Sequence, residues 1–178
     1  NLQYQTISEL SQKISQKSFL ELAKNKKAYM KESPVLWCTE CQTSIAQAEL
    51  ETKECETTFN YLNFATPIGA LLIATTRPEL LAGCVCIFVH PEDERYQNYI
   101  GRKAAVPLYD FEIPILADET VSMEKGTGAV MCATFGDTAD IDWCQKHHLP
   151  YKKIILPNGT IDETVAYIGG MTIRKARQ

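Results

Sequence analysis

The most chemically suggestive segment carries two aspartates, Gly136-Asp137-Thr-Ala-Asp140. Asp137 is a residue type that caps helix N-termini, and Asp140 follows three positions later, which is close to a capping box. Both carboxylates would complement the helix dipole. The same spacing also brings two negative charges together at one helix end, where they could hold an ammonium group. Capping accounts for Asp137 better than for Asp140, because Glu is the usual residue at that position.

Two hydroxyls and a guanidinium form a second candidate site edge in Thr75-Thr76-Arg77-Pro78-Glu79. Proline suits the first turn of a helix, so we expect a strand-to-helix junction here. Backbone amides at a helix N-terminus attract anions and acceptor atoms. The alternative is that Thr76 only caps the short helix and that Arg77 is exposed to solvent. The residues by themselves favour neither interpretation.

A third candidate is the glycine loop Gly126-Thr127-Gly128. Two glycines allow the backbone to approach a ligand closely. The loop matches neither a P-loop nor the G-x-G-x-x-G motif.

His147 and His148 end the helix that Asp137 begins, where their charge suits the C-terminal dipole, so we assign them a structural role.

The seven cysteines argue against a secreted disulfide framework, because their number is odd and their spacing is scattered. Cys38-Thr-Glu-Cys41 differs from the rest, since C-x-x-C after Trp37 is half of a zinc knuckle. Zinc normally takes four ligands. The site is therefore either completed by residues outside this chain or vestigial, and a redox role is less favoured. The remaining cysteines in apolar segments are expected to be buried small hydrophobes, namely Cys84, Cys86, Cys132 and Cys144.

Hydrophobic periodicity predicts the elements that position these candidates. Short strands interrupted by short helices indicate a mixed α/β fold with a β-barrel-like core and short peripheral helices, rather than a doubly wound sheet. The expected helices cover residues 6–31, 79–82, 91–99 and 137–148. The expected strands cover residues 48–62 (one long or two short), 70–75, 84–89, 103–108, 112–116 and 129–133, followed by a hairpin over 154–161.

The length, composition and net charge of the chain exclude several classes of protein. The chain has 178 residues, about one domain by the usual range, with 45% hydrophobic and 22% charged residues, typical of a soluble globular protein. A net charge of −4 argues against wrapping nucleic acid by bulk charge, and no apolar run is long enough to span a membrane. The chain begins at Asn1, so we expect a piece of a longer protein. Candidate phosphate contacts, or simply solvated faces, are Lys24–Lys31, Lys152-Lys153 and Arg174–Arg177.

In this order, the motifs resemble the editing insertion of class I aminoacyl-tRNA synthetases, which serves the valine, isoleucine and leucine enzymes. The resemblance covers residues 33–178, with 1–32 as an N-terminal helical segment. Arg-Pro-Glu-Leu-Leu, Ile-Phe-Val-His-Pro and Cys-Ala-Thr-Phe-Gly-Asp make the chain most similar to the archaeal type of valine enzyme. The motifs that carry the resemblance are Ser33–Cys41, Ile45–Glu51, Ile73–Glu79, Val89–Tyr96, Ile113–Ile115, Glu124–Gly128 and Gly136–Asp140.

The resemblance implies hydrolysis of the ester in mischarged Thr-tRNA(Val), after transfer of the amino acid, within a valine–tRNA ligase. Valine and threonine are nearly isosteric, and the apolar synthetic pocket of these enzymes rejects threonine by only about 10², so a second site must remove it. An isoleucine or leucine editing domain, or a non-catalytic RNA-binding module, remains the alternative.

The resemblance also assigns roles. Asp140 matches the aspartate that binds the α-ammonium of the misattached residue, and Asp137 would support that charge or accept from the threonine hydroxyl. Thr76, together with Thr75 and Arg77, matches the edge that holds the ester and the terminal adenosine. Gly126, Thr127 and Gly128 would approach the terminal ribose. Many relatives of the bacterial valine type carry Lys and Thr where this chain has Met131 and Ala133, and Thr134 is expected to substitute as a polar contact.

The implied reaction needs no cofactor and uses a positioned water, assisted by a ribose hydroxyl of the tRNA. Zinc is expected in the full-length enzyme, with Cys38 and Cys41 near the stem of the insertion and a second cysteine pair beyond residue 178. ATP and Mg would serve the other domain of the parent enzyme. The implied partners are the 3′ end of tRNA(Val) carrying threonine and the remainder of the synthetase chain, in the cytoplasm and without a membrane.

Overall fold

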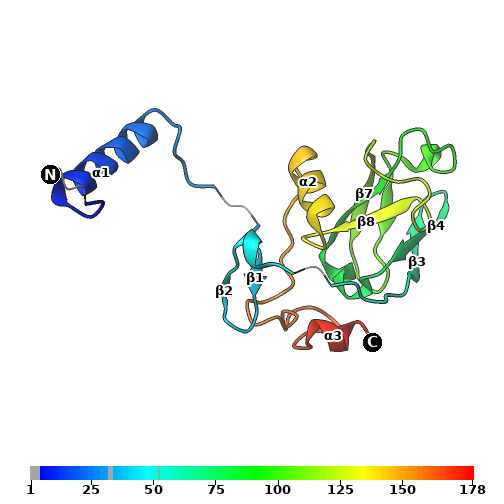
Figure 1. Ribbon diagram of the computed structural model, residues 1–178. Helices are drawn as coiled ribbons and strands as arrows, with labels where there is room; N and C mark the ends of the chain where they lie inside the picture. The colour runs from blue at the N-terminus through cyan, green and yellow to red at the C-terminus, as the bar shows by residue number, and fades with distance from the viewer. Residues whose placement is uncertain (1–4, 32–33, 52) are drawn as a thin grey trace. The chain divides into compact units, whose positions relative to one another are not determined.

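The computed structural model describes residues 5–31, 34–51 and 53–178 (Figure 1). The chain divides into two units, Asn1–Pro34 and Val35–Gln178. The predicted boundary between residues 32 and 33 lies outside the described residues. Among the described residues, no helix combines the length and the apolar composition needed to cross a membrane.

The N-terminal unit is built on helix α1 (Glu9–Lys24). Ser8 caps its start by accepting a hydrogen bond from the Ser11 amide at 3.3 Å. Lys26 takes a left-handed conformation with φ 56°, which ends the helix. The helix is therefore shorter at both ends than the predicted 6–31. None of its residues is buried, so its apolar side chains remain at least partly exposed.

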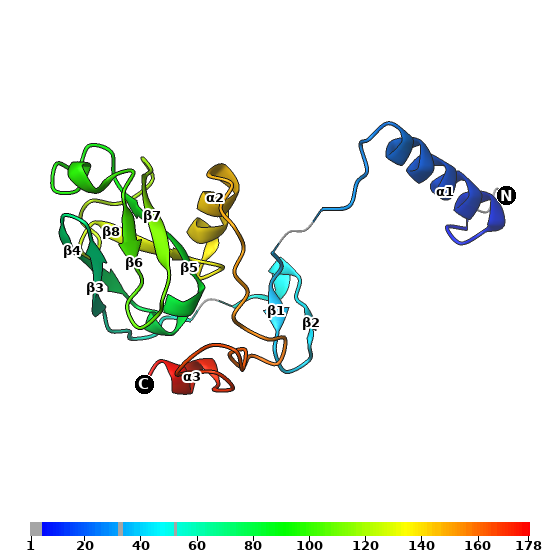
Figure 2. The same cartoon turned by 180° about the vertical axis from the view of Figure 1, so that it is seen from behind.

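The second unit contains a six-stranded sheet in the order β4-β3-β6-β7-β5-β8. Only β5 and β7 pair in parallel, and the other neighbours are antiparallel. The outermost strands β4 and β8 also lie against each other, so the sheet curls into a nearly closed barrel (Figures 1 and 2). The strands are β3 (Asn60–Thr66), β4 (Gly69–Thr75), β5 (Cys84–Val89), β6 (Lys103–Ala105), β7 (Glu112–Ala117) and β8 (Ala129–Ala133).

Two apolar clusters fill the barrel and cover one side of it. Phe64, Ile73 and Ile115 lie in the larger cluster, which the strands enclose. Phe88 and Trp143 lie in the second, between the outer face of β5–β8 and helix α2 (Thr138–Lys146). Strand β5 is buried on both faces, which explains why it is a continuous apolar run rather than an alternating one.

The remaining elements are short and peripheral. Helices η1 (Gln47–Glu49), η2 (Pro78–Gly83), η3 (Gln97–Tyr99) and α3 (Ile173–Ala176) each span at most six residues. Strands β1 (Trp37–Cys38) and β2 (Thr43–Ser44) form a separate hairpin. The predicted mixed α/β fold with a barrel-like core and short helices is confirmed.

Several predicted boundaries are wrong. The strand expected over 48–62 begins only at Asn60, because the side chains of residues 53–59 are exposed and the weak alternation there faces no core. Residues 91–99 form turns that end in η3 rather than a continuous helix. Strand β6 stops at Ala105, and Leu108 has φ 66°, which an extended strand cannot accommodate. The 154–161 hairpin is reduced to a single bridge between Ile155 and Ile161.

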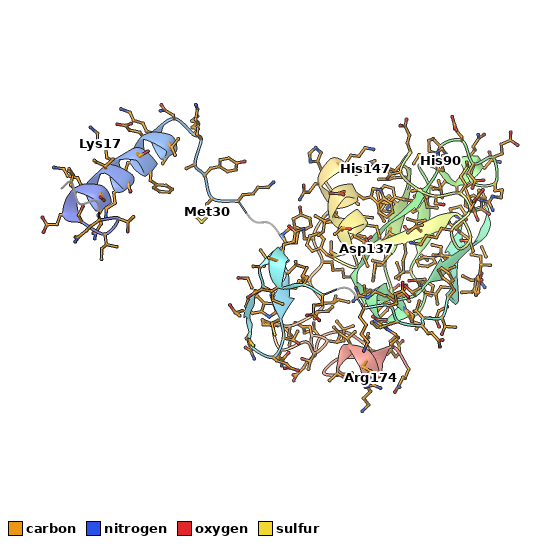
Figure 3. The ribbon with its side chains drawn as sticks, viewed as in Figure 1. Lys17, Met30, His90, Asp137, His147 and Arg174 are labelled. Carbon is orange, nitrogen blue, oxygen red and sulfur yellow. The ribbon has the colours of Figure 1, made fainter. Side chains whose placement is uncertain are left out.

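Asp118, just after β7, ties the C-terminal end of α2 to the barrel. Its buried carboxylate accepts from Lys146 Nζ at 2.8 Å, from Thr120 Oγ1 at 2.6 Å and from His147 Nε2 at 2.7 Å. Trp143 Nε1 donates to the same Thr120 hydroxyl at 2.8 Å. His147 thus has the structural role that its position predicted, and Figure 3 shows it at the opposite end of α2 from Asp137. Burial raises the pKa of Asp118, but the hydrogen bonds outweigh it and hold the pKa well below its usual range.

This network predicts a loss of stability in acid. Asp118 binds a proton less readily in the folded than in the unfolded chain, so its contribution is present above about pH 4 and is lost as the pH falls further. We expect Asp118→Asn to lower the free energy of unfolding at pH 7 by about 2 kcal/mol and to flatten its dependence between pH 5 and pH 3. Urea unfolding at each pH measures this.

The matched control is Asp110→Asn, at an exposed position, which should stay within about 0.5 kcal/mol of the wild type. An Asp118→Asn variant as stable as the wild type at pH 7 would show that the network contributes nothing to folding.

Candidate functional site

The three segments singled out in the sequence meet at the end of β4. A Cβ built on Gly126 would lie 3.0 Å from the Cβ of Ala74, so the glycine loop lies against the C-terminal end of β4. Arg77, just after the strand, donates from Nη1 to the carbonyl of Gly136. Residues 126–128 and 136–140 therefore both contact the end of β4 or the residues just after it, although the intervening chain is up to about fifty residues long.

Asp140 is a buried carboxylate of this region, with 6% of its surface exposed. Its Oδ2 accepts hydrogen bonds from the amides of Gly136 at 2.8 Å and Asp137 at 3.3 Å. Its own amide donates to Asp137 Oδ1 at 3.0 Å, which completes the predicted capping box. Asp137 itself is exposed. A Cβ on Gly136 would collide with Asp140 Oδ2, so this close approach requires glycine at position 136.

The surroundings of Asp140 set its protonation. Burial raises the pKa of Asp140 to about 6, and the nearby charge of Asp137 acts in the same direction. The amides of Gly136 and Asp137 oppose this shift by hydrogen bonding to the ionised form. An ammonium group bound beside Asp140 would lower its pKa again, because an opposite charge favours the carboxylate. The arrangement is suited to bind a cation rather than to remain an isolated buried charge.

Arg77 and the two threonines shape the opposite edge. Arg77 Nε lies 3.3 Å from Glu79 Oε1, so the guanidinium spans Glu79 and Gly136 instead of lying free in solvent. Thr75 Oγ1 accepts from the Arg77 amide at 3.1 Å. The N-cap of η2 is Arg77, so the alternative role of Thr76 as the cap is wrong. The Thr76 hydroxyl forms no hydrogen bond within the described part of the chain, which leaves it for a ligand.

A segment that sequence reasoning left without a role braces the glycine loop. Arg95 is held by Asp93, with Nε to Oδ1 at 2.8 Å and Nη2 to Oδ2 at 2.6 Å, and Nη2 also donates to Met123 O at 2.8 Å. Tyr96 Oη donates to Thr127 O at 2.6 Å. A Cβ on Gly128, at φ 84°, would lie 2.6 Å from Arg95 Nη2. The pattern Asp-x-Arg-Tyr was visible in the sequence, but nothing local connected it to a loop some thirty residues away.

Thr134 lies differently from the other candidates. Its Oγ1 donates to Lys152 O at 2.9 Å and accepts from Lys152 N at 2.8 Å. The hydroxyl therefore connects the end of β8 to the backbone of Lys152. Met131 and Ala133 are buried in the barrel cluster. The structure thus brings Thr75, Arg77 and Asp140 together, while it directs the Thr134 hydroxyl to the backbone of the following segment.

Cys38 and Cys41 occupy the turn between β1 and β2. The Cys41 amide donates to Cys38 Sγ at 3.4 Å, and this bond, followed by one from Glu40, lowers the pKa of the Cys38 thiol. An N–H group directed at sulfur favours the thiolate, which is the form that binds zinc. No group of three or more His, Cys, Asp or Glu side chains converges on a metal position within the described residues. The turn thus offers two cysteine thiols, of which only Cys38 has its pKa lowered, whereas the hydrogen bond to Cys38 raises the pKa of Cys41.

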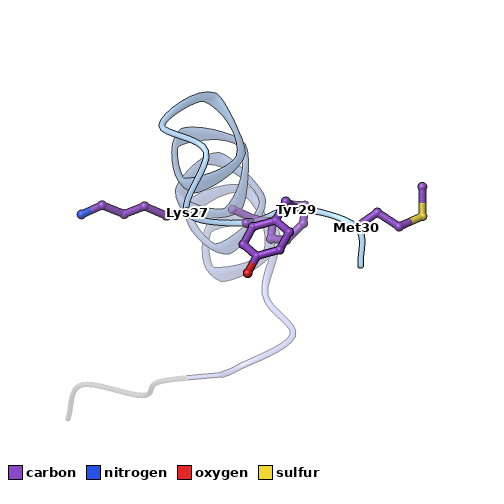
Figure 4. Close-up of a pocket in the computed structure, with 5 residues that line it drawn as sticks. Lys27, Tyr29 and Met30 are labelled. Atoms are coloured by element: carbon purple, nitrogen blue, oxygen red, sulfur yellow. The ribbon is translucent and has the colours of Figure 1, made fainter. Parts of the chain in front are cut away.

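The hollow in Figure 4 is separate from these residues. It lies in the N-terminal unit and is lined by Phe19, Lys27, Ala28, Tyr29 and Met30. None of the candidate site residues lines it.

Comparison with known proteins agrees with this geometry. The model of the family "Leucyl-tRNA synthetase, editing domain" matches residues 90–173. A valine–tRNA ligase of Rickettsia rickettsii (strain Sheila Smith) is 49% identical over 99% of this chain and 22% of its own length. The valine–tRNA ligase of the archaeon Haloarcula marismortui is 42% identical over 98% of this chain and 20% of its own. The chain belongs to the editing domains of class I aminoacyl-tRNA synthetases.

This editing domain spans about a fifth of the length of the valine–tRNA ligases that it matches. Its fold is also similar to part of agnB2 LeuRS from Agrobacterium radiobacter K84, solved in a ternary complex with tRNA and LeuAMS. That likeness has a TM-score of 0.55 at 20% identity and covers 68% of this chain and 18% of the other. The similarity to archaeal as well as Rickettsia enzymes confirms the predicted family.

The brace on the glycine loop of this editing domain generates a prediction. Tyr96→Phe removes the hydrogen bond to Thr127 O, and we expect the free energy of unfolding to fall by about 1 kcal/mol. Amide exchange should quicken at Gly128, whose N–H is bonded to Lys125 O across the loop. Hydrogen exchange read by NMR measures this.

Tyr99→Phe is the matched control, because the Tyr99 hydroxyl forms no hydrogen bond within the described ranges. Equal exchange at Gly128 in both variants would contradict a bracing role for Tyr96.

Proposed function

We propose that this editing domain hydrolyses the ester of Thr-tRNA(Val) within a valine–tRNA ligase. The observation that carries the proposal is the buried Asp140 carboxylate at the N-terminus of α2, facing the Thr75–Arg77 edge. Valine–tRNA ligases are the relatives that match the chain over nearly its whole length, which favours this specificity.

Asp140 would bind the α-ammonium of the misattached amino acid. The amides of Gly136 and Asp137 both donate to Oδ2, and no backbone amide of the described residues donates to Oδ1. An ammonium group at Oδ1 would form a charge-assisted hydrogen bond with a carboxylate that the protein has already oriented. This contact would fix the ester carbonyl relative to the end of β4.

Ester hydrolysis would then depend on positioning and electrostatics. No Ser-His-Asp arrangement is found among the described residues, and a water molecule would be the nucleophile. The free hydroxyl of Thr76 would orient that water or the ester, and a ribose hydroxyl of the tRNA would assist. Holding the reactants in an attacking geometry and stabilising the developing oxyanion supplies the rate enhancement in such a site.

The selection of threonine over valine would come from polar contacts. Asp137 is exposed and lies one helical turn before Asp140, so its free carboxylate oxygen could accept from the threonine hydroxyl. Valine would leave that contact unpaired, which costs binding energy. Met131 and Ala133 add no polar group to the region, because their side chains are apolar. Both are buried in the barrel cluster. Thr134 remains a candidate contact only if its hydroxyl releases the backbone of Lys152.

The proposed partners are the 3′ end of the charged tRNA and the remainder of the synthetase chain, in the cytoplasm. The glycine loop, with Gly126 and Gly128 at positive φ, would approach the terminal ribose. Helix α1 exposes Leu10, Ile14 and Leu20, which supports a contact with other parts of a longer chain. ATP and Mg would be used by the other domain of that chain, and editing itself would need no cofactor.

The test is deacylation of Thr-tRNA(Val) by the full-length enzyme, beside Val-tRNA(Val), Val-tRNA(Ile) and Ile-tRNA(Leu). We expect selective loss of Thr-tRNA(Val) and a decrease of about 100-fold in kcat/KM for Asp140→Asn, because the substrate ammonium loses its buried partner. For the wild type, kcat/KM should rise with pH through about 6, as Asp140 ionises, and then level off.

Asp142→Asn is the matched control, since Asp142 is exposed on the same helix. Preferred cleavage of Val-tRNA(Ile) or Ile-tRNA(Leu) would move the specificity to the isoleucine or leucine enzymes, in line with the leucyl family model. Hydrolysis of none of the four esters would favour a non-catalytic RNA-binding module.

We also propose that Cys38 and Cys41 supply two of four zinc ligands, the other two coming from elsewhere in the full-length chain. Elemental analysis should find about one zinc per full-length chain and about none in residues 1–178 alone. Cys38→Ser should abolish binding, whereas Cys55→Ser, at an exposed position outside the turn, should not. A full-length enzyme without zinc would show that the turn is vestigial.

A further inference from the structure

Glu79 is a fully buried carboxylate that the catalytic proposal does not use. Its side chain has no exposed surface. Arg177 binds both of its oxygens, with Nη2 to Oε1 at 2.6 Å and Nε to Oε2 at 3.1 Å. Arg77 Nε approaches Oε1 from the other side at 3.3 Å. Burial raises the pKa of Glu79, but these guanidinium contacts outweigh it and keep the pKa below its usual range.

The two arginines connect Glu79 to the editing site. Arg77 also donates from Nη1 to Gly136 O, and the amide of Gly136 donates to Asp140 Oδ2 at 2.8 Å. Gly136 is therefore held at its carbonyl by Arg77, while its amide holds Asp140. One continuous series of hydrogen bonds runs from Arg177, next to helix α3, to the carboxylate at the start of α2.

Arg77 binds Glu79 with one nitrogen and the Gly136 carbonyl with another. The bidentate contact of Arg177 with Glu79 explains why Arg77 keeps both partners. A guanidinium that binds both carboxylate oxygens satisfies them in one plane. Without Arg177, Glu79 Oε2 would be buried and unpaired, and Arg77 would be the remaining cation in contact with the carboxylate. Arg77 would then turn its second nitrogen towards Glu79 and release Gly136 O.

We propose that Arg177 and Glu79 are positioning residues for the editing site, because they hold Arg77 on the Gly136 carbonyl and so aim the Gly136 amide at Asp140. The effect on catalysis rests on the proposed function, whereas the effect on Asp140 does not. Arg177 lies 98 residues from Glu79, so the contact makes the site dependent on the segment that follows the barrel.

The titration of Asp140 gives a direct readout. The ionisable groups that face it are Asp137 on its own helix and the thiols of Cys84, Cys132 and Cys144. None of these contacts Arg177. A Gly136 amide that is less well directed would stabilise the Asp140 carboxylate less, so its pKa would rise.

The experiment is a ¹³C NMR titration of the Asp140 carboxyl in the wild type and Arg177→Gln. We expect the pKa to rise by about half a unit in the variant. Arg177→Lys, which keeps the charge but cannot bind both oxygens in one plane, should give a smaller rise. Lys103→Gln is the matched control, since it removes one positive charge from the exposed pair with Glu112 and should leave the Asp140 pKa unchanged.

Deacylation by the full-length enzyme gives the second readout. Arg177→Gln should lower kcat/KM for Thr-tRNA(Val) by about twofold at pH 6, with a smaller decrease at pH 8, where Asp140 is ionised in both proteins. At pH 6 the decrease should come mainly from a higher KM, because a protonated Asp140 no longer attracts the substrate ammonium. An unchanged Asp140 pKa in Arg177→Gln would overturn the proposal.

The NMR titration and the deacylation assay distinguish failure of the proposed function from failure of the role of Arg177. A wild-type enzyme that hydrolyses none of the esters would refute the proposed function, while the titration would still decide the role of Arg177. A wild type that hydrolyses the ester, with unchanged kcat/KM in Arg177→Gln at both pH values, would refute the catalytic part of this inference alone.

Discussion

The buried carboxylate of Asp140 is the constraint around which the rest of the site is arranged. Removing a carboxylate from water is unfavourable unless hydrogen-bond donors replace the solvent. Here the donors are the amides of Gly136 and Asp137, and they reach Oδ2 only because residue 136 has no side chain to obstruct them. A carboxylate held in this way is oriented before a ligand arrives, and under the proposed function its remaining oxygen would bind the substrate ammonium.

The barrel supplies the rigid frame for this arrangement. Strands β4 and β8 are the two edges of the sheet, and their approach closes the barrel beside the residues that follow each strand. Arg77 follows β4 and Gly136 follows β8, so one hydrogen bond between them joins the two edges at the site. Helix α2 is fixed to the outer face by Trp143 and by the Asp118 network at its far end. Both ends of the helix that carries Asp140 are therefore anchored.

Most of the functional geometry is held from outside the residues that would touch a substrate. Tyr96 holds the glycine loop at the Thr127 carbonyl, Arg95 holds the segment before the loop at the Met123 carbonyl, and Glu79 positions Arg77. Side chains that bind backbone carbonyls leave the ligand-facing groups free. This division explains why charged residues such as Asp93 and Glu79 are buried here although neither lies where a ligand would bind.

The local features were predictable from the order of the residues alone. The continuous apolar runs of β5 and β8, the capping box of α2 and the turn at Cys38–Cys41 were all predictable, because their signals come from residues within a few positions of one another. The family and the barrel-like class followed from the order of the motifs. The weak alternation over 48–59 was misleading, because a two-residue period indicates a strand only where one face packs against a core.

The partners of the polar side chains became clear only from the folded structure. The pairing of Glu79 with Arg177 spans 98 residues and that of Tyr96 with Thr127 spans 31, and no local pattern specifies either. Thr134 was a reasonable polar contact in the sequence, yet its hydroxyl is used by the backbone of Lys152. The physical reason is that a hydrogen bond depends on where two groups are placed in space, and the closure of the barrel brings together groups that the chain keeps far apart.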